Sequence, residues 1–210
     1  MKGVQKITIL ILAVLVLAAC SRKKDTFINR NYHAVTAEFN TIYNGDVAFD
    51  DGKEELAATY DDNFWELLTV ERIKLDYQGL PGETENTNFA RAEEKAAKAI
   101  QKHSMYIDGK EYNPQVDEAY MLLGKARYYD KRFIPAIDAF NFILDKYPTS
   151  NSINRAKVWK AKSNIRLRNE DVALENLQKM MDEEELEDEE LAEAAAMMTQ
   201  AYINLDSISE

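Results

Sequence analysis

The stretch "AYMLLGKARYYDKRFIPAIDAFNFILDKYP", residues 119–148, decides the fold. Its apolar residues recur at helical spacing on both sides of Lys131, which predicts two short helices joined by a tight turn. Gly124 and Ala136 fall where the two helices of such a hairpin cross, and only small side chains allow that close approach. Pro148 ends the second helix, because proline disfavours helix at the residue before it and supplies no N–H.

The spacing of this stretch resembles the tetratricopeptide repeat (TPR), a helical hairpin of about 34 residues. Counted from Asp117, six residues match the repeat pattern, namely Tyr120, Leu123, Gly124, Ala136, Phe140 and Pro148. Two positions depart from it: Arg127 replaces the usual tyrosine, and Lys131 replaces the common turn glycine. The resemblance implies an all-α chain whose TPR-like hairpins stack into a superhelical solenoid.

Further copies follow the first. "RAKVWKAKSNIRLRNEDVALENLQKM", residues 155–180, places Ala161 and Ala173 at the equivalent crossing points, and Ala173 lies 37 residues after Ala136. A third copy begins near Glu187 with "LAEAAAMMTQAYINL", so residues 116–210 are expected to be TPR repeats, the last of them truncated. An apolar terminal helix with nothing to bury it is not a natural end. We therefore expect residues 1–210 to be the front portion of a longer protein.

Residues 31–115 fit the same frame more loosely and are expected to form a divergent helical, TPR-like region. We predict a helix over about 31–44, a turn at Asn44-Gly45-Asp46 and a second helix over about 47–60, so that residues 39–56 form a divergent hairpin. "DDNFWELLTV" adds a helical turn, and residues 76–88 form a loop rich in glycine and polar residues. A helix over 88–105 follows, and "IDGKEYNPQ" then turns the chain.

The first twenty residues are typical of a secretory signal. Lys2 and Lys6 precede an apolar run over 7–19, which is too short for a permanent membrane span. Leu17-Ala18-Ala19-Cys20 resembles the lipobox of bacterial lipoproteins, which implies cleavage after residue 19 and acylation of the sulfur and the new amino group of Cys20. The alternative is an uncleaved short anchor. The expected organisation is therefore a signal peptide over 1–19 and a lipidated tether over 20–30, with the rest facing the periplasm at the outer membrane.

Composition excludes several classes of function. The formal charge is −11 and becomes −13 without the two signal lysines, which argues against nucleic acid and against general adhesion to anionic lipid. No phosphate loop, nucleophile elbow or zinc-protease helix is present, and we expect no enzyme activity, metal or cofactor. His33 and His103 could each meet a carboxylate, but histidines on helices usually lie at the surface or the core edge. "DEEELEDEE", residues 182–190, is either a solvated turn before a helix or a docking patch for a basic partner.

Binding therefore has to come from a surface. In stacked TPR hairpins the first helices line a concave groove that holds an extended peptide or a helix. The groove positions with anchoring side chains are Met121, Lys125, Tyr128, Tyr129, Arg155, Lys162 and Arg166, and Glu118, Val158 and Ile165 lie beside them. Basic and aromatic residues on one face of an acidic protein suggest a protein-binding groove. The alternative is that they are ordinary helix-surface residues with acidic neighbours.

Longer segments carry a more particular resemblance. "CSRKKDTFINRNYHAVTAEFNTIYNG", "DDNFWELLTVE", "NIRLRNEDVALENL" and above all the run from Asn88 to Ser150 are similar to the TPR lipoproteins of Bacteroidota gliding motility and type IX secretion (SprE/PorW type). This resemblance implies a non-enzymatic scaffold whose partners are other proteins of the secretion and motility apparatus. Only Cys20 has a functional role to carry over, as the acylated residue.

Two rival functions stay open from the sequence. Helical lipoproteins of outer-membrane uptake systems bind glycans or nutrients, and Trp65 or Trp159 could form the aromatic platform that a sugar requires. A catalytic domain beyond Glu210 would make the whole protein an enzyme.

Overall fold

The structure is a computed structural model that describes residues 21–65, 67–73, 86–183 and 185–205. These residues are mostly helical, which confirms the expected all-α class. The predicted signal peptide over 1–19, Cys20 and nearly all of the predicted loop over 76–88 lie outside the described residues. The elements are α2 (Phe27–Ala37), η1 (Glu38–Ile42), α3 (Tyr43–Ala58), α4 (Thr87–His103), β1 (Tyr106–Ile107), β2 (Lys110–Glu111), α5 (Val116–Tyr129), α6 (Phe133–Lys146), α7 (Ile153–Arg166), α8 (Glu170–Glu183) and α9 (Asp188–Asn204).

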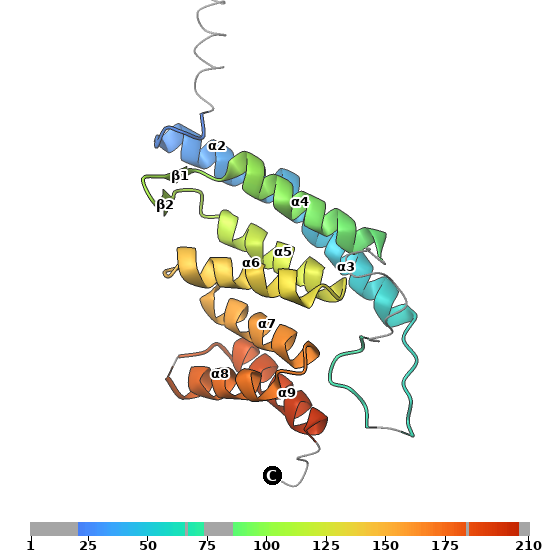
Figure 1. Cartoon of the computed structure of the whole chain (residues 1–210). Helices are drawn as coiled ribbons and strands as arrows, with labels where there is room; N and C mark the ends of the chain where they lie inside the picture. Colours follow the sequence, from blue (N-terminus) through green and yellow to red (C-terminus); the bar gives the residue numbers. More distant parts are fainter. Residues whose placement is uncertain (1–20, 66, 74–85, 184, 206–210) are drawn as a thin grey trace, which may run out of the picture.

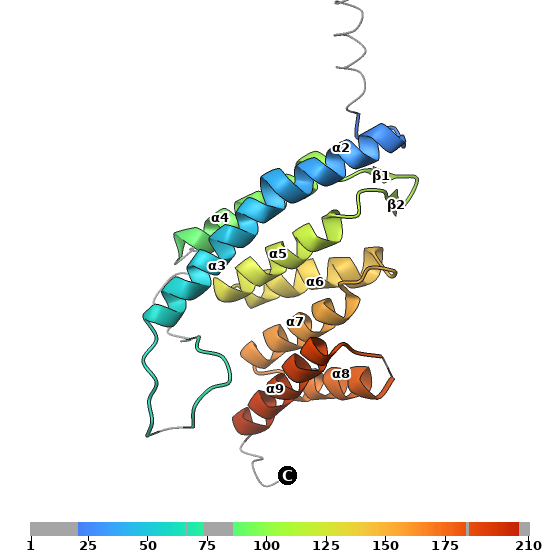
Figure 2. The ribbon, with the colours of Figure 1, turned by 180° about the vertical axis from the view of Figure 1, so that it is seen from behind.

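The helices form two layers (Figure 1). The long helix α2–η1–α3 and the helices α4 to α9 each pack antiparallel to the next helix along the chain, so that successive helices alternate between the layers. One layer holds α2–α3, α5, α7 and α9, and the other holds α4, α6 and α8; Figure 2 shows the first layer from its open side. Three consecutive apolar clusters run down the stack, between α3, α4 and α5, then between α5, α6 and α7, then between α7, α8 and α9. The first layer is the one on which the sequence places the candidate groove.

The predicted turn at Asn44-Gly45-Asp46 is wrong. The chain runs as one continuous helix from Phe27 to Ala58, with a π-helical segment, η1, in its middle. Gly45 lies on the buried face, where an added Cβ would come within 2.6 Å of the Leu122 side chain. Gly52 similarly meets the ring of Phe89 at 2.7 Å. Both glycines therefore permit close helix packing instead of turning the chain, and the partner of this helix is α4 rather than a second half of residues 39–56.

The helix predicted over 88–105 is α4, which begins at Thr87 because the Asn86 side chain accepts hydrogen bonds from the N–H groups of Asn88 and Phe89. The expected turn after it contains a two-stranded hairpin, in which Tyr106 pairs with Glu111. Asp108 and Gly109 form its tip with positive φ values of 48° and 82°. The helical turn predicted in "DDNFWELLTV" is present only in part. The chain turns at Phe64-Trp65, where the Asn63 side chain accepts a hydrogen bond from the Trp65 N–H at 3.2 Å, but the described residues of this stretch form no helix.

The two predicted hairpins over 117–180 are present as α5–α6 and α7–α8. Their turns match residue for residue, because Lys131 and Arg168 have φ values of 60° and 63° and lie 37 positions apart. In the first turn the N–H of Arg132 donates to the carbonyl of Arg127 at 2.9 Å, and in the second that of Asn169 donates to the carbonyl of Asn164 at 2.9 Å. Each turn thus closes its helix in the same left-handed way.

The crossing inside the first hairpin differs in one detail from the expectation. Gly124 faces the ring of Phe140, not Ala136, and an added Cβ would lie 2.3 Å from that ring. The departure at Arg127 also has a structural reason. Its Nε donates to Glu93 of α4 at 2.8 Å and its Nη1 donates to the carbonyl of Pro135 at 3.0 Å, so this arginine ties the first regular hairpin to α4.

The acidic run over 182–190 separates α8 from α9. Glu187 caps α9 and exchanges hydrogen bonds with Glu190, and Asp188, Glu189 and Glu190 fill the first helical turn. Carboxylates are favourable there because the N-terminus of a helix carries partial positive charge.

Candidate functional site: a basic face occupied by residues 69–73

The basic side chains predicted on the groove do gather on the first layer, but the apolar and aromatic ones are not free to anchor a partner. Met121 is 1% exposed and lies in the core, which corrects its assignment to an open face. Tyr129 is half-buried and stacks on Phe89, with the ring centroids 5.4 Å apart. Tyr128 is buried between Trp159 and Phe133. Val158 and Ile165 are also core residues.

Glu71 occupies the centre of this face. Its carboxylate pairs with Lys162 Nζ at 2.5 Å and with Arg166 Nη2 at 3.0 Å, and it accepts a hydrogen bond from the Tyr128 hydroxyl. Arg166 Nε donates to the same hydroxyl at 2.9 Å. Lys162 Nζ also reaches Glu193 of α9 at 2.7 Å. Three of the predicted groove residues therefore contact one carboxylate, and that carboxylate comes from a residue outside the helices.

That carboxylate belongs to a non-helical segment, residues 69–73, which we call the strap. Its backbone is held by α9, because the N–H of Val70 donates to Gln200 Oε1 at 2.7 Å. Ile73 is 4% exposed and joins the core cluster of α5, α6 and α7. In both Figure 1 and Figure 2 the strap lies beside α7 and α9 on the first layer. The face on which the sequence places the groove is therefore covered by a short stretch of the same chain.

The electrostatics of the strap site follow from burial and pairing. Burial by itself would raise the pKa of Glu71, but Lys162, Tyr128 and Arg166 outweigh it and hold that pKa below its ordinary value. Burial raises the pKa of the Tyr128 hydroxyl, and the neighbouring Glu71 carboxylate raises it further. The site thus favours an ionised carboxylate next to a neutral phenol. It is built to hold a negative charge.

The two remaining basic residues lie beside this cluster. Lys125 Nζ sits over the ring of Trp159, 5.5 Å from its centroid, and burial lowers the pKa of its amine. Arg155 pairs with Glu118. The alternative of ordinary helix-surface residues with acidic neighbours fits Arg155. Lys162 is buried instead and pairs with both Glu71 and Glu193, and Arg166 pairs with Glu71. The sequence held one signal of this arrangement, since buried cations on an acidic protein require carboxylate partners.

The two histidines meet each other, a contact that no local pattern indicates. Nδ1 of His33 on α2 lies 3.2 Å from Nδ1 of His103 at the end of α4, and both side chains are buried. Burial lowers the pKa of each imidazole. No group of three or more histidine, cysteine or acidic side chains within reach of one metal ion is found among the described residues.

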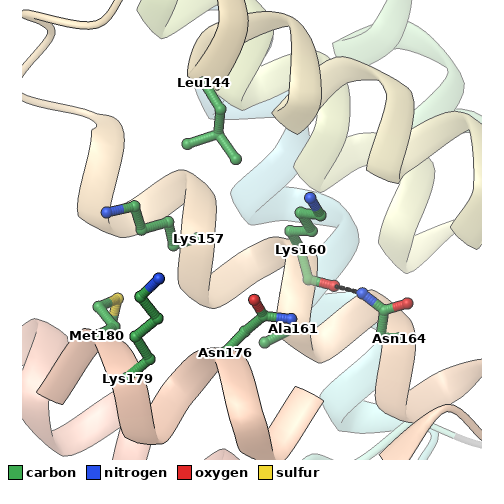
Figure 3. A pocket seen from close by; sticks show the side chains of 8 residues that line it. All are labelled: Leu144, Lys157, Lys160, Ala161, Asn164, Asn176, Lys179 and Met180. Carbon is green, nitrogen blue, oxygen red and sulfur yellow. Dashed lines mark hydrogen bonds between the residues drawn. The ribbon is translucent and has the colours of Figure 1, made fainter. Parts of the chain in front are cut away.

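A second surface feature lies on the opposite side of α7, between α6, α7 and α8. It is a hollow of about 340 Å³ whose apolar lining residues are Leu144, Ala161 and Met180. Figure 3 shows lysine side chains from two helices around it. The lysines are Lys157, Lys160 and Lys179. This hollow was not predicted, although lysines at positions 157 and 160 share a helix face by their spacing.

Of the two tryptophans that the glycan hypothesis proposes as a sugar platform, only one is exposed. Trp159 is 8% exposed and is covered by Lys162, whose Nζ lies 3.8 Å from the ring centroid, so it offers no surface to a sugar. Trp65 is 95% exposed and is the tryptophan that stays available.

These observations define a class: an all-α chain of sequentially packed antiparallel helices, with a carboxylate-binding face on one layer. No protein-family model matches the chain, and no curated protein is found to be related to it. Within the described segments, no helix is both long and apolar enough to span a bilayer.

Proposed function

We propose that this chain is a periplasm-facing lipoprotein, anchored through Cys20, whose TPR-like hairpins form a scaffold for protein–protein contacts. The matched turns of α5–α6 and α7–α8 support the repeat character, because two units related by one shift of 37 residues repeat the same backbone geometry. The particular assignment to type IX secretion and gliding motility rests on the sequence resemblance alone.

One observation carries the binding function, namely that the face of α5, α7 and α9 already holds a non-helical segment by its carboxylate. Lys162 and Arg166 supply charge, Gln200 supplies a backbone hydrogen bond and the core receives Ile73. The same set of contacts would recognise a segment of another protein with an acidic residue two positions before an aliphatic one. The strap would then be the internal competitor of that partner.

A peptide experiment tests this groove. The double variant Glu71→Gln, Ile73→Ser loosens the strap in the detergent-solubilised full chain. A labelled peptide "LLTVERI", the sequence of residues 67–73, should then bind, measured by fluorescence anisotropy. Wild-type protein should bind it at least about tenfold more weakly, because a tethered segment competes at millimolar effective concentration. A peptide with lysine in place of the glutamate is the matched control and should not bind.

Equal binding of both peptides, or no binding to a loosened variant that keeps its helical circular dichroism, would remove the groove from the proposal. The cellular role needs a separate test. Deleting the chain in its host should stop export of type IX cargo while ordinary periplasmic export continues, and the wild-type copy should restore it. Undiminished cargo export would refute the type IX assignment and leave the groove result unaffected.

A further inference from the structure

The long helix at the outer edge of the stack exposes a continuous apolar stripe. Figure 2 shows this helix, α2–η1–α3, facing outward along its length. Phe27 is 82% exposed, Phe39 61% and Tyr43 62%, although each belongs to an ordered helix. The full stripe is Phe27, Ile28, Tyr32, Val35, Phe39, Tyr43 and Val47.

The π-helical segment keeps the stripe on one face. A regular α-helix has 3.6 residues per turn, so a spacing of four residues drifts around it. The wider turn of η1 absorbs that drift between Val35 and Tyr43, and the opposite face stays buried from Ala37 to Phe49. The outward face is thus as regular as the inward one. Several aromatic rings in one row offer several hundred Å² of apolar surface, at about 150–250 Å² for a whole ring, which on a monomer marks a contact surface.

Charge is distributed unequally along this helix. Three exposed cations, Arg22, Lys23 and Lys24, and one exposed anion, Asp25, precede the stripe. Four exposed anions, Asp50, Asp51, Glu54 and Glu55, and one exposed cation, Lys53, follow its last residue. Lys23 lies fourteen residues before Ala37 and Asp51 lies fourteen after it, so the two charged ends are equidistant from the middle of the stripe. A mainly basic segment before the helix, an apolar stripe along it and a mainly acidic end are complementary to a second copy in the antiparallel direction.

We propose that two copies of this chain pair through α2–η1–α3 in an antiparallel, two-fold symmetric dimer centred at the level of Ala37. In this register Phe27 of one copy lies opposite Val47 of the other, Val35 opposite Phe39, and Lys23 opposite Asp51. A standard specific interface buries about 800 Å² per partner, and the several hundred Å² of apolar surface on the stripe would form the centre of such an interface. This proposal is independent of the groove and of the strap.

Crosslinking of the full chain in its own membranes tests the pairing and its direction. One copy carries Phe27→Cys and a first tag, and the other carries Val47→Cys and a second tag. Membranes that contain both copies are treated with a short bismaleimide. We expect a crosslink between the two tags at least about five times stronger than between two Phe27→Cys copies, because only the antiparallel register brings positions 27 and 47 together. A copy without an introduced cysteine measures what Cys20 yields alone, and Glu175→Cys, an exposed site on α8, is the control for random encounter.

Charge exchange provides the second test. Lys23→Glu with Lys24→Glu should reduce crosslinking several-fold, and so should Asp50→Lys with Asp51→Lys. Co-expressing the two charge variants should restore it, because each reversed end then meets an opposite charge. Three outcomes would overturn the proposal: crosslinking that is stronger between two Phe27→Cys copies, crosslinking that is no stronger than in the Glu175→Cys control, or crosslinking that is not restored when the two charge variants are co-expressed. Unchanged protease resistance of each variant establishes that the fold is intact.

Discussion

Glu71 illustrates how one buried carboxylate can fix a segment that has no secondary structure. Its side chain is 13% exposed and has Lys162, Arg166 and Tyr128 as partners, so ionisation costs little in place. Replacing Glu71 by a neutral residue is costly, because the Arg166 guanidinium then stays buried with less negative charge beside it. The loss of stability is confined to the strap, since Lys162 keeps its ion pair with Glu193 of α9.

We predict that Glu71→Gln releases the strap while the helices stay folded. The free energy of local opening should fall by about 3 kcal/mol, the usual cost of breaking a buried ion pair, which corresponds to roughly a hundredfold faster cleavage. Trypsin cleavage after Arg72, followed by mass spectrometry under native conditions, measures it. Glu175→Gln, an exposed change on α8, should leave the rate unaltered. An unchanged rate in Glu71→Gln would mean that the strap is held by Ile73 and Gln200 alone.

The histidine pair gives a pH dependence with a definite sign. Burial, followed by the Arg22 charge, lowers the pKa of His33, and burial, followed by His33, lowers that of His103. Both are therefore neutral when folded, and the unfolded chain takes up protons more readily near pH 6.5. The stability that they contribute is complete above that pH and is lost as the pH falls through it towards the folded values.

We expect urea unfolding to show a free energy that declines between about pH 7 and pH 5. In His33→Phe this decline should be smaller, because one of the two titrating groups is gone and His103 no longer has the His33 imidazole beside it. His33 Nε2 is buried without a hydrogen-bond partner, so an apolar ring removes an existing penalty. A decline as steep in the variant as in the wild type would show that acidic groups elsewhere cause it.

At the scale of single elements, α3 shows how a glycine can be read wrongly. An exposed glycine within a helix gains about 0.5–1 kcal/mol on replacement by alanine. At Gly52 the new Cβ would lie 2.7 Å from the Phe89 ring. We therefore predict that Gly52→Ala lowers the free energy of unfolding by about 1–3 kcal/mol. Thermal unfolding measures the sign. Asp51→Ala, on the exposed neighbouring position, is the control and should change stability little.

The matched turns allow a stabilising prediction. Arg168 has a φ of 63°, which costs a residue with a Cβ about 1 kcal/mol. Its side chain is 72% exposed and pairs at 3.4 Å with Glu170, which is buried and also accepts a hydrogen bond from Asn204. Arg168→Gly should therefore raise the unfolding free energy by about 0.5 kcal/mol, after allowance for the greater freedom of glycine in the unfolded chain. Arg168→Ala keeps the unfavourable φ and should give no gain. If both variants lose stability equally, the turn relaxes in solution and the backbone strain is absent.

The sequence predicted these elements to different degrees, for physical reasons. Helices α5 to α8 were predictable because small and aromatic residues recur at fixed offsets, and those offsets determine local packing. The Asn44-Gly45-Asp46 turn was mispredicted because a glycine for close packing and a glycine for a turn look alike until the neighbouring helix is known. The strap was missed because Glu71 meets Arg166 across 95 residues of sequence, and no local pattern encodes such a contact.

At the scale of the whole molecule, the first layer carries two kinds of surface. The strap closes the face of α5, α7 and α9, and the stripe on α2–η1–α3 leaves the outer edge apolar. The acidic surplus of the chain then has two uses: some carboxylates neutralise buried cations within the groove, and others form the acidic end of the stripe. A chain of formal charge −11 can in this way present both a binding site for a carboxylate and a site for its own basic end.

The membrane anchor is the last prediction at this scale. The lipobox resemblance of Leu17-Ala18-Ala19-Cys20 predicts that membrane attachment depends on Cys20 and the residues before it. Growth with an alkyne-labelled palmitate should label the wild-type chain, and Cys20→Ala should lose the label and remain at the size of the uncleaved chain, since the processing peptidase acts after lipid has been added to the cysteine. Ser21→Ala is the matched control and should keep both label and size. Label retained in Cys20→Ala would place the lipid elsewhere. A wild-type chain that fractionates with membranes but never takes up label would instead identify the segment over 7–19 as an uncleaved anchor.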